Sequence, residues 1–312
     1  MAKYLVTGGA GFIGSSIVRE LLARGERPRV LDNFATGKRE NLADVAARIE
    51  LVEGDLRDTA AVAAACRGVD CVFHEAALPS VPRSLERPQE SNDVNVTGTL
   101  NLLVAARDAG VRRVVYAGSS SAYGNTPILP KVETMAPNPL SPYAVAKLTG
   151  ELYCSVFARN YGLETVVLRY FNVFGPRQDP TSPYAAVIPK FLKAIAAGES
   201  PVMFGDGTQS RDFTYVDNVV AGNLLAATAP GVSGEVMNVA CSERVTLLDL
   251  HAQLCSLLGR SVKPRFAPPR TGDVQHSLAD IGKARRLLGY SPVVPFAEGL
   301  RRLEQWTRTP SA

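Results

Sequence analysis

A glycine-rich turn near the N-terminus constrains the fold more than any other feature of this sequence. Residues 4–14 read YLVTGGAGFIG, a β-prone run followed by glycines and then by the start of a stretch with helical apolar spacing. In such a strand–turn–helix unit, Gly8 takes the tight turn, Gly11 lets the backbone approach a diphosphate, and Gly14 lets the helix pack on the strand. The helix N-terminus then presents N–H groups and a positive dipole to phosphate. The turn therefore predicts a dinucleotide-binding site.

The first half of the chain alternates between short β-prone runs and stretches with helical spacing. The β-prone runs are Tyr4–Val6, Arg29–Leu31, Ile49–Val52, Cys71–Phe73, Val114–Tyr116 and Thr165–Leu168. Alternating strands and helices fold into a parallel sheet with crossover helices on both faces. We therefore predict an α/β protein with a doubly wound Rossmann parallel sheet.

After about Phe174 the pattern changes, because prolines become frequent and the strands become shorter. We expect a smaller C-terminal substrate-binding lobe, and a length of 312 residues is enough for about two domains. The residues from 212 to 227 are interpreted as another strand and helix that return to the main sheet. The predicted division is 1–174 plus about 212–240 for the Rossmann domain, and about 175–211 plus 241–308 for the lobe.

Charge, hydropathy and cysteine usage exclude several classes of protein. The net charge of +4 is spread thinly, and the densest basic stretch is 283–286, so we expect no nucleic-acid partner. The longest purely apolar run, 60–66, is far shorter than the roughly 18 residues of a membrane span. Five cysteines without a C-x-x-C pair indicate reduced thiols in the cytoplasm. The three histidines are scattered, so we predict no metal site.

Polar residues that follow the predicted strands indicate which dinucleotide binds. Asp32 ends the second strand, and a carboxylate there accepts hydrogen bonds from ribose hydroxyls and repels a 2′-phosphate. This favours NAD over NADP, although Lys38 nearby leaves NADP open. Asp55, after the third strand, is placed to accept from the adenine amine. Ala76 and Ala77, after the fourth strand, are small enough for the cofactor to lie against their backbone.

A tyrosine and a lysine four residues apart predict acid–base chemistry. Tyr143 and Lys147 lie on one face of a predicted helix, and an adjacent ammonium lowers a phenol pKa by favouring the phenolate. Tyr143 is then a general base for an alcohol proton, and Lys147 can also hold the hydroxyls of the nicotinamide ribose. Ser119 follows the fifth strand and is predicted to hydrogen-bond the reacting hydroxyl and Tyr143. His74 is interpreted as structural.

Almost the whole chain resembles the extended short-chain dehydrogenase/reductase superfamily, in its nucleotide-sugar branch. The motifs that carry this resemblance are the glycine turn, the Ser119–Tyr143–Lys147 set, NVTG at 95–98, RYFNVFG at 169–175 and GDGTQSRDF at 205–213. More narrowly, the chain is similar to UDP-hexose 4-epimerases and most of all to bacterial UDP-N-acetylglucosamine 4-epimerases. That similarity rests on SVPRS at 80–84, LSPYA at 140–144, QDP at 178–180, YAAVIPK at 184–190 and GDVQHSLAD at 272–280.

The resemblance implies the activity, NAD-dependent 4-epimerisation of UDP-GlcNAc and UDP-GalNAc, and also of UDP-Glc and UDP-Gal. Tyr143 takes the 4′-hydroxyl proton while C4 gives its hydride to NAD⁺, and the resulting 4-keto sugar rotates before the hydride returns. Related dehydratases and decarboxylases carry an acidic residue where this chain has Ser121, which favours epimerisation. A UDP-glucuronate 4-epimerase, a net oxidoreductase and a non-enzymatic dinucleotide sensor remain alternatives.

The resemblance also assigns further residues. It adds five to the cofactor site: Phe12, Ile13, Asn33, Leu56 and Asn95. It places the diphosphate at Asn172, Arg211 and Arg270, the nucleotide against Val187 and Lys190, the uridine ribose at Asp273, the hexose at Gln178 and Ser121, and C2 of the hexose at Ser277. Because Ser277 is small, an N-acetyl group should fit beside it. Members of this branch are usually homodimers, and the helices near 96–109 and 144–160 are the candidate contact.

Overall fold

A seven-stranded parallel sheet forms the centre of the computed structural model, which describes residues 3–179, 186–269 and 274–308. The strands are β1 (Tyr4–Thr7), β2 (Arg29–Asp32), β3 (Glu50–Glu53), β4 (Cys71–His74), β5 (Arg113–Ser119), β6 (Glu164–Tyr170) and β11 (Glu235–Val239). Their order is β11-β6-β5-β4-β1-β2-β3, and every pair is parallel. All six predicted strands and the Rossmann-like α/β fold are confirmed. The order reverses between β1 and β4, where such sheets bind ligands beyond the carboxyl ends of their strands.

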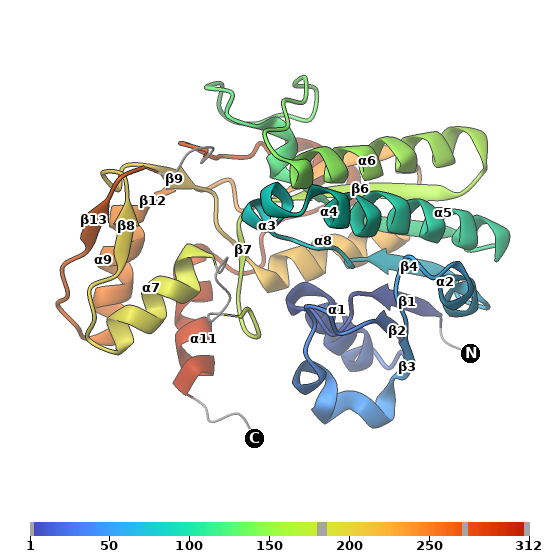
Figure 1. Ribbon diagram of the computed structural model, residues 1–312, viewed down its shortest axis with the longest axis horizontal. Helices are drawn as coiled ribbons and strands as arrows, with labels where there is room; N and C mark the ends of the chain where they lie inside the picture. Colours follow the sequence, from blue (N-terminus) through green and yellow to red (C-terminus); the bar gives the residue numbers. More distant parts are fainter. Residues whose placement is uncertain (1–2, 180–185, 270–273, 309–312) are drawn as a thin grey trace.

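Helices cover both faces of the sheet (Figure 1). One face carries α2 (Thr59–Cys66), α5 (Gly98–Asp108) and α6 (Pro142–Asn160), and the other carries α1 (Phe12–Ala23), η1 (Arg39–Arg48) and α8 (Val216–Thr228). Side chains alternate across a strand, so neighbouring residues enter different cores. Leu5 packs in the core under α5, whereas Val6 packs in the core under α1. Both cores are apolar, as a sheet covered on two faces requires.

The C-terminal lobe is built from short elements. They include α7 (Val187–Ala196), β8 (Val202–Phe204), β9 (Ser210–Arg211), β12 (Val245–Thr246), α9 (Leu247–Leu258), β13 (Arg265–Ala267), α10 (Gly282–Leu288) and α11 (Phe296–Arg308). The strands of the lobe form only two-stranded pairs, β8 with β13 and β9 with β12. The core under α1 continues into the lobe through an aromatic cluster of Phe174, Phe213, Tyr215 and Phe296. The lobe and the sheet therefore share one core.

One expectation about the returning segment needs correction. The predicted strand at 212–216 contains β10 (Thr214–Tyr215), which pairs with β7 (Val173–Phe174) in a separate two-stranded sheet. The strand that joins the main sheet is β11, which follows α8 and pairs with β6. α8 packs on the face of the sheet at β5 and β6, so the chain reaches the free edge of β6 only after this helix, at β11. The division into two domains stays a prediction.

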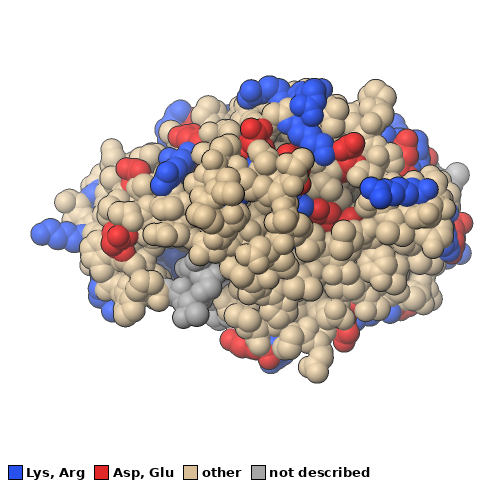
Figure 2. All heavy atoms as spheres, turned by 90° about the horizontal axis from the view of Figure 1, so that it is seen from above, with Lys and Arg blue, Asp and Glu red and all other residues tan. Residues whose placement is uncertain are grey.

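Short helices and turns connect these elements near the carboxyl edge of the sheet. They are α3 (Val81–Glu86), α4 (Pro88–Asn92), η2 (Asp93–Thr97) and η3 (Ser120–Tyr123). Within the described ranges, no helix is long and apolar enough to cross a membrane. On the face seen in Figure 2, Lys and Arg side chains are interspersed with Asp and Glu side chains.

Candidate active site

The glycine turn is followed by a helix N-terminus without a side-chain cap at the carboxyl edge of β1. Gly8 has a φ of +68°, and a Cβ built on it would lie 2.7 Å from the Ala76 backbone. A Cβ on Gly14 would lie 2.2 Å from the Gly8 carbonyl oxygen, so neither position accepts a side chain. No described side chain caps α1, and its first turn carries no acidic residue. This cradle fits an anionic diphosphate.

Asp32 lies beside this cradle, as predicted. One carboxylate oxygen accepts from the Ala10 N–H at 2.9 Å, and the other accepts from the Phe34 N–H at 2.8 Å. Burial nevertheless raises the pKa of Asp32 above its usual value. Each carboxylate oxygen can accept about two hydrogen bonds, so both retain capacity for a ribose hydroxyl.

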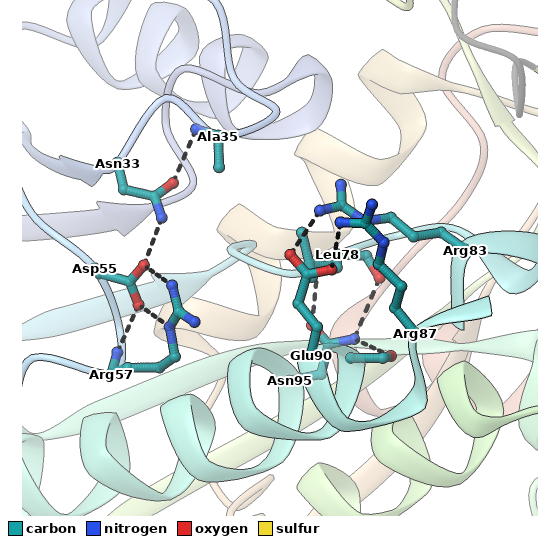
Figure 3. Close-up of polar contacts among 10 residues, drawn as sticks. Asn33, Ala35, Asp55, Arg57, Leu78, Arg83, Arg87, Glu90 and Asn95 are labelled. Atoms are coloured by element: carbon teal, nitrogen blue, oxygen red, sulfur yellow. Dashed lines mark hydrogen bonds and ion pairs between the residues drawn. The ribbon is translucent and has the colours of Figure 1, made fainter. Parts of the chain in front are cut away.

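Asn33 and Asp55 lie together at the ends of β2 and β3 (Figure 3). Asn33 donates to Asp55 at 2.7 Å, and Arg57 binds both oxygens of the same carboxylate at 2.8 and 2.9 Å and adds a bond from its backbone N–H. These bonds to Arg57 lower the pKa of Asp55. A carboxylate has about four acceptor positions, and these four donors match that number. An adenine amine would therefore have to displace one of them.

Two other predicted cofactor residues, Asn95 and Leu56, are buried and contact other residues of the protein. Asn95 is buried, and its amide accepts from the Leu78 N–H and donates to the Leu78 carbonyl, which fixes the loop after β4 (Figure 3). Leu56 is buried against Gly98. Their roles in the cofactor site stay predictions. Ala76 and Ala77 are partly exposed at the end of β4, and Phe12 and Ile13 are partly buried at the start of α1.

His74 bonds the hydroxyls of Thr7 and Thr99 through its two ring nitrogens. Burial lowers the pKa of His74 to about 3, so the ring is neutral. These contacts agree with the structural interpretation of His74.

Tyr143, Ser119 and Ser121 come together at the end of β5. Ser141 caps α6 by accepting from the Ala144 N–H, and Pro142 opens the helix, so Tyr143 lies in its first turn. Ser119 hydrogen-bonds Tyr143, and the Ser121 hydroxyl donates to Ser119 at 2.8 Å. The structure therefore brings together the hydroxyls that the sequence predicted.

The expected effect of Lys147 on Tyr143 is wrong for this structure. The Lys147 ammonium is buried and donates to the Ala117 carbonyl at 2.9 Å, and it lies 5.0 Å from the centre of the Tyr116 ring. Burial raises the pKa of Tyr143, and the hydrogen bond from Ser119 only partly opposes this. The reason is that loss of hydration of the phenolate on burial is the largest contribution to the pKa of Tyr143. Burial also lowers the pKa of Lys147.

Glu75 is a residue that the sequence reasoning missed. It follows β4, accepts from the Tyr170 hydroxyl at 2.8 Å, and raises the pKa of Lys147 through its charge. Burial raises the pKa of Glu75 itself. The sequence signal that could have pointed to Glu75 is a carboxylate directly after a buried strand. Its partners, Tyr170 on β6 and Lys147 on α6, are distant in the sequence.

Apart from Ser121, the predicted substrate residues fall into three groups: residues that line a cavity, residues that lie near one, and residues outside the described ranges. Asn172, Val187 and Arg211 line a cavity of about 250 Å³ between β7 and α7. Arg211 also lines a larger cavity of about 820 Å³ against β8, β13 and residues 274–275. Arg270 and Asp273 lie outside the described residues.

Three further substrate residues lie near these cavities. Gln178 donates to the Val173 carbonyl at 3.1 Å, and Lys190 lies in α7 beyond Val187. Ser277 is buried, and its N–H donates to the carbonyl of Ser210, the neighbour of Arg211. Ser277 is not one of the described residues that line either cavity. Its place beside a bound hexose stays a prediction.

Comparison with known proteins identifies the family. The profile of the NAD dependent epimerase/dehydratase family matches residues 4–240, which is most of the chain. The chain belongs to this family, and NAD is its cofactor. A UDP-glucose 4-epimerase of Mycolicibacterium smegmatis is 39% identical over 99% of both chains. The resemblance to UDP-hexose 4-epimerases is confirmed.

Solved structures of family members superpose over nearly the whole chain. A UDP-N-acetylglucosamine 4-epimerase from Methanobrevibacter ruminantium M1, in complex with UDP-N-acetylmuramic acid, has a TM-score of 0.93 and 41% identity over 98% of both chains. A UDP-glucose 4-epimerase of Thermus thermophilus, in complex with NAD, has a TM-score of 0.89 and 38% identity, covering 98% of this chain and 99% of the other. Within the described part of this chain, no group of three His, Cys, Asp or Glu residues is placed to hold a metal.

Proposed function

We propose that this protein is a UDP-sugar 4-epimerase and that UDP-GlcNAc and UDP-GalNAc are its preferred substrates. The observation that carries the proposal is the hydroxyl pair Ser119–Tyr143 at the end of β5, with Ser121 beside it. Family members that eliminate or decarboxylate need a further acidic side chain at the position of Ser121. In this chain, that position carries a hydroxyl instead. The relatives described above, which epimerise UDP-Glc or UDP-GlcNAc, add support.

In the proposed reaction, Tyr143 accepts the proton of the sugar 4′-hydroxyl, and Ser119 orients that hydroxyl by a hydrogen bond. NAD, when bound, takes up a hydride and gives it back, so no net oxidation occurs. The 4-keto sugar rotates in the cavity, so that the hydride would return to the opposite face of C4 while Tyr143 returns its proton to the 4′-oxygen. Lys147 binds the hydroxyls of the nicotinamide ribose.

Most of the proposed substrate contacts come from the C-terminal lobe. Arg211 and Arg270 bind the diphosphate, because a guanidinium pairs strongly with phosphate oxygens. Asn172 contacts the same group, Val187 and Lys190 lie against the nucleotide, and Asp273 holds the uridine ribose. Gln178 and Ser121 face the hexose. Ser277, beside C2, leaves room for an N-acetyl group.

The experiment that tests this function is a comparison of four substrates. Purified protein is incubated separately with UDP-GlcNAc, UDP-GalNAc, UDP-Glc and UDP-glucuronate, and the sugars released by mild acid are separated. We expect interconversion of the two acetylated sugars without net formation of NADH. Conversion of UDP-glucuronate alone would overturn the substrate assignment, and a steady rise in NADH absorbance would indicate a net oxidoreductase.

We also propose a cytoplasmic homodimer. The residues Val145, Leu152 and Val156 lie on one face of α6, and their side chains are exposed although apolar. Leu85 on the adjacent α3 is 61% exposed and extends this apolar face. Light scattering of the purified protein should give twice the chain mass, and Leu152→Glu should reduce it to one chain.

A further inference from the structure

A short segment connects the sheet edge with both sides of the cofactor cradle. We call Gly175–Asp179, which leaves β7, the strap. At its start, a Cβ built on Gly175 would lie 3.5 Å from the Phe12 ring, so the strap begins beside a side chain of the first turn of α1. That turn is the uncapped helix N-terminus described above.

Arg177 anchors the strap to α1. Its guanidinium donates to the Ser15 hydroxyl at 3.2 Å and to the Ser16 hydroxyl at 3.1 Å. Both serines are buried, and both donate to the Phe12 carbonyl, so the anchor is part of the helix turn itself. Arg177 has a φ of +67°, which non-glycine residues rarely adopt. The backbone is held in this conformation while its side chain is docked.

The far end of the strap meets the other side of the cradle. Asp179 forms an ion pair with Lys38 at 3.2 Å. The N–H of Lys38 donates to the carbonyl of Ala10, whose own N–H binds Asp32. The strap therefore spans from the helix turn, where the diphosphate fits, to the loop beside Asp32, where the ribose fits.

Gln178 lies between these two anchors, and its amide donates to the Val173 carbonyl at 3.1 Å. Its Oε1 atom is buried and has no hydrogen-bond partner among the described residues. A buried acceptor without a donor is costly unless a ligand or water supplies one. This orientation is consistent with a strap that is closed over a binding site.

We propose that the strap retains bound NAD, with Arg177 as its main anchor and the Lys38–Asp179 pair as a weaker second anchor. Release of the cofactor then requires Arg177 to leave Ser15 and Ser16. The inference rests on NAD binding and not on the sugar that the enzyme converts. It fits a reaction in which the cofactor is regenerated at every turnover and gains nothing by leaving.

The test is the rate at which NAD leaves the protein. Protein loaded with radiolabelled NAD is diluted into excess unlabelled NAD, and the retained label is followed on filters in the absence of any sugar. Arg177→Ala should speed release by about tenfold, because two charge-assisted bonds are lost. Asp179→Asn should have a smaller effect that disappears at high salt, because an exposed ion pair is screened.

Matched variants separate retention from general damage. Arg24→Ala removes an exposed arginine at the other end of α1 and should leave the release rate unchanged. Ser15→Ala combined with Ser16→Ala removes the acceptors while keeping Arg177, and should reproduce the faster release. Affinity for UDP, measured by calorimetry, should stay unchanged in every variant.

Release from Arg177→Ala within twofold of the unmodified protein would overturn the proposal. If that variant does not fold, the same criterion applies to the double serine variant. Since no sugar is present, failure of the proposed epimerase activity would leave this result unaffected.

Discussion

The cofactor half and the C-terminal lobe assemble their sites in different ways. In the cofactor half, Gly8 follows β1, and Asp32 and Ser119 end β2 and β5, so the parallel sheet itself brings them to one edge. In the lobe, Val187 and Arg211 lie on α7 and β9, which meet only through packing. Parallel strands align their carboxyl ends automatically, whereas short paired strands must be fixed by particular side chains.

Asp212 is the clearest example of such a fixing side chain in the lobe. It is fully buried, and its carboxylate accepts from the N–H groups of Cys241, Ser242 and Ala279. Burial raises its pKa to about 7 in spite of these bonds. One carboxylate thus ties three segments together next to Arg211. The comparison therefore predicts two classes of variant. Substitutions at the sheet edge should impair the chemical step, whereas substitutions in the lobe should impair substrate recognition.

The largest effect should come from Tyr143→Phe. Loss of the proton acceptor at the sheet edge should reduce kcat by about 10²–10⁴-fold, the usual contribution of a general base. NAD binding and the circular dichroism spectrum should remain as in the unmodified protein. A variant that keeps more than half of the activity would contradict the role proposed for Tyr143, and Ser119→Ala should cost less.

A smaller effect, confined to substrate choice, is expected from Ser277→Tyr. The bulky ring should exclude an N-acetyl group and change the ratio of kcat/KM for UDP-GlcNAc and UDP-Glc by about 10–200-fold. Turnover of UDP-Glc should survive. Equal loss on both sugars would mean that the change merely damages the lobe.

A pair of aspartate variants tests the comparison directly. Asp32→Ala should weaken NAD binding by about tenfold and relax discrimination against NADP, because ribose bonds and charge repulsion are lost together. Asp212→Asn should instead raise the KM for UDP-sugar by about tenfold, because the amide places a donor against a backbone N–H. Calorimetry with NAD and with UDP measures both. Equal effects of either variant on both ligands would remove the distinction between the two halves.

The smallest effect concerns pH. The proposed binding of ribose hydroxyls by Lys147 uses its ammonium form, and the charge of Glu75 raises the pKa of Lys147. In Glu75→Gln that negative charge is gone, so Lys147 should lose its proton at a lower pH. The alkaline limb of the kcat/KM profile should therefore move to lower pH, and an unchanged limb would show that Glu75 does not act on Lys147.

Local sequence patterns predicted much of the cofactor half. The six predicted strands and the start of α1 could be found because strand and helix periodicities are local. The pKa of Tyr143 could not, because its direction depends on how deeply α6 packs against β5. Glu75, Arg177 and Asp212 were missed for a related reason, since each acts through partners far away in the chain.

The sequence alone determined the strand–turn–helix unit and the Tyr143–Lys147 pair, because each consists of residues close together in the chain, and it determined the Rossmann sheet through the alternation of such local patterns. The tertiary structure decided that β11 rather than the 212–216 strand joins the sheet, that Lys147 donates to Ala117, and that Arg177 binds Ser15. These outcomes depend on contacts between segments up to about 160 residues apart, such as Arg177 and Ser15. Burial and long-range hydrogen bonding set their energies, and neither can be read from local spacing.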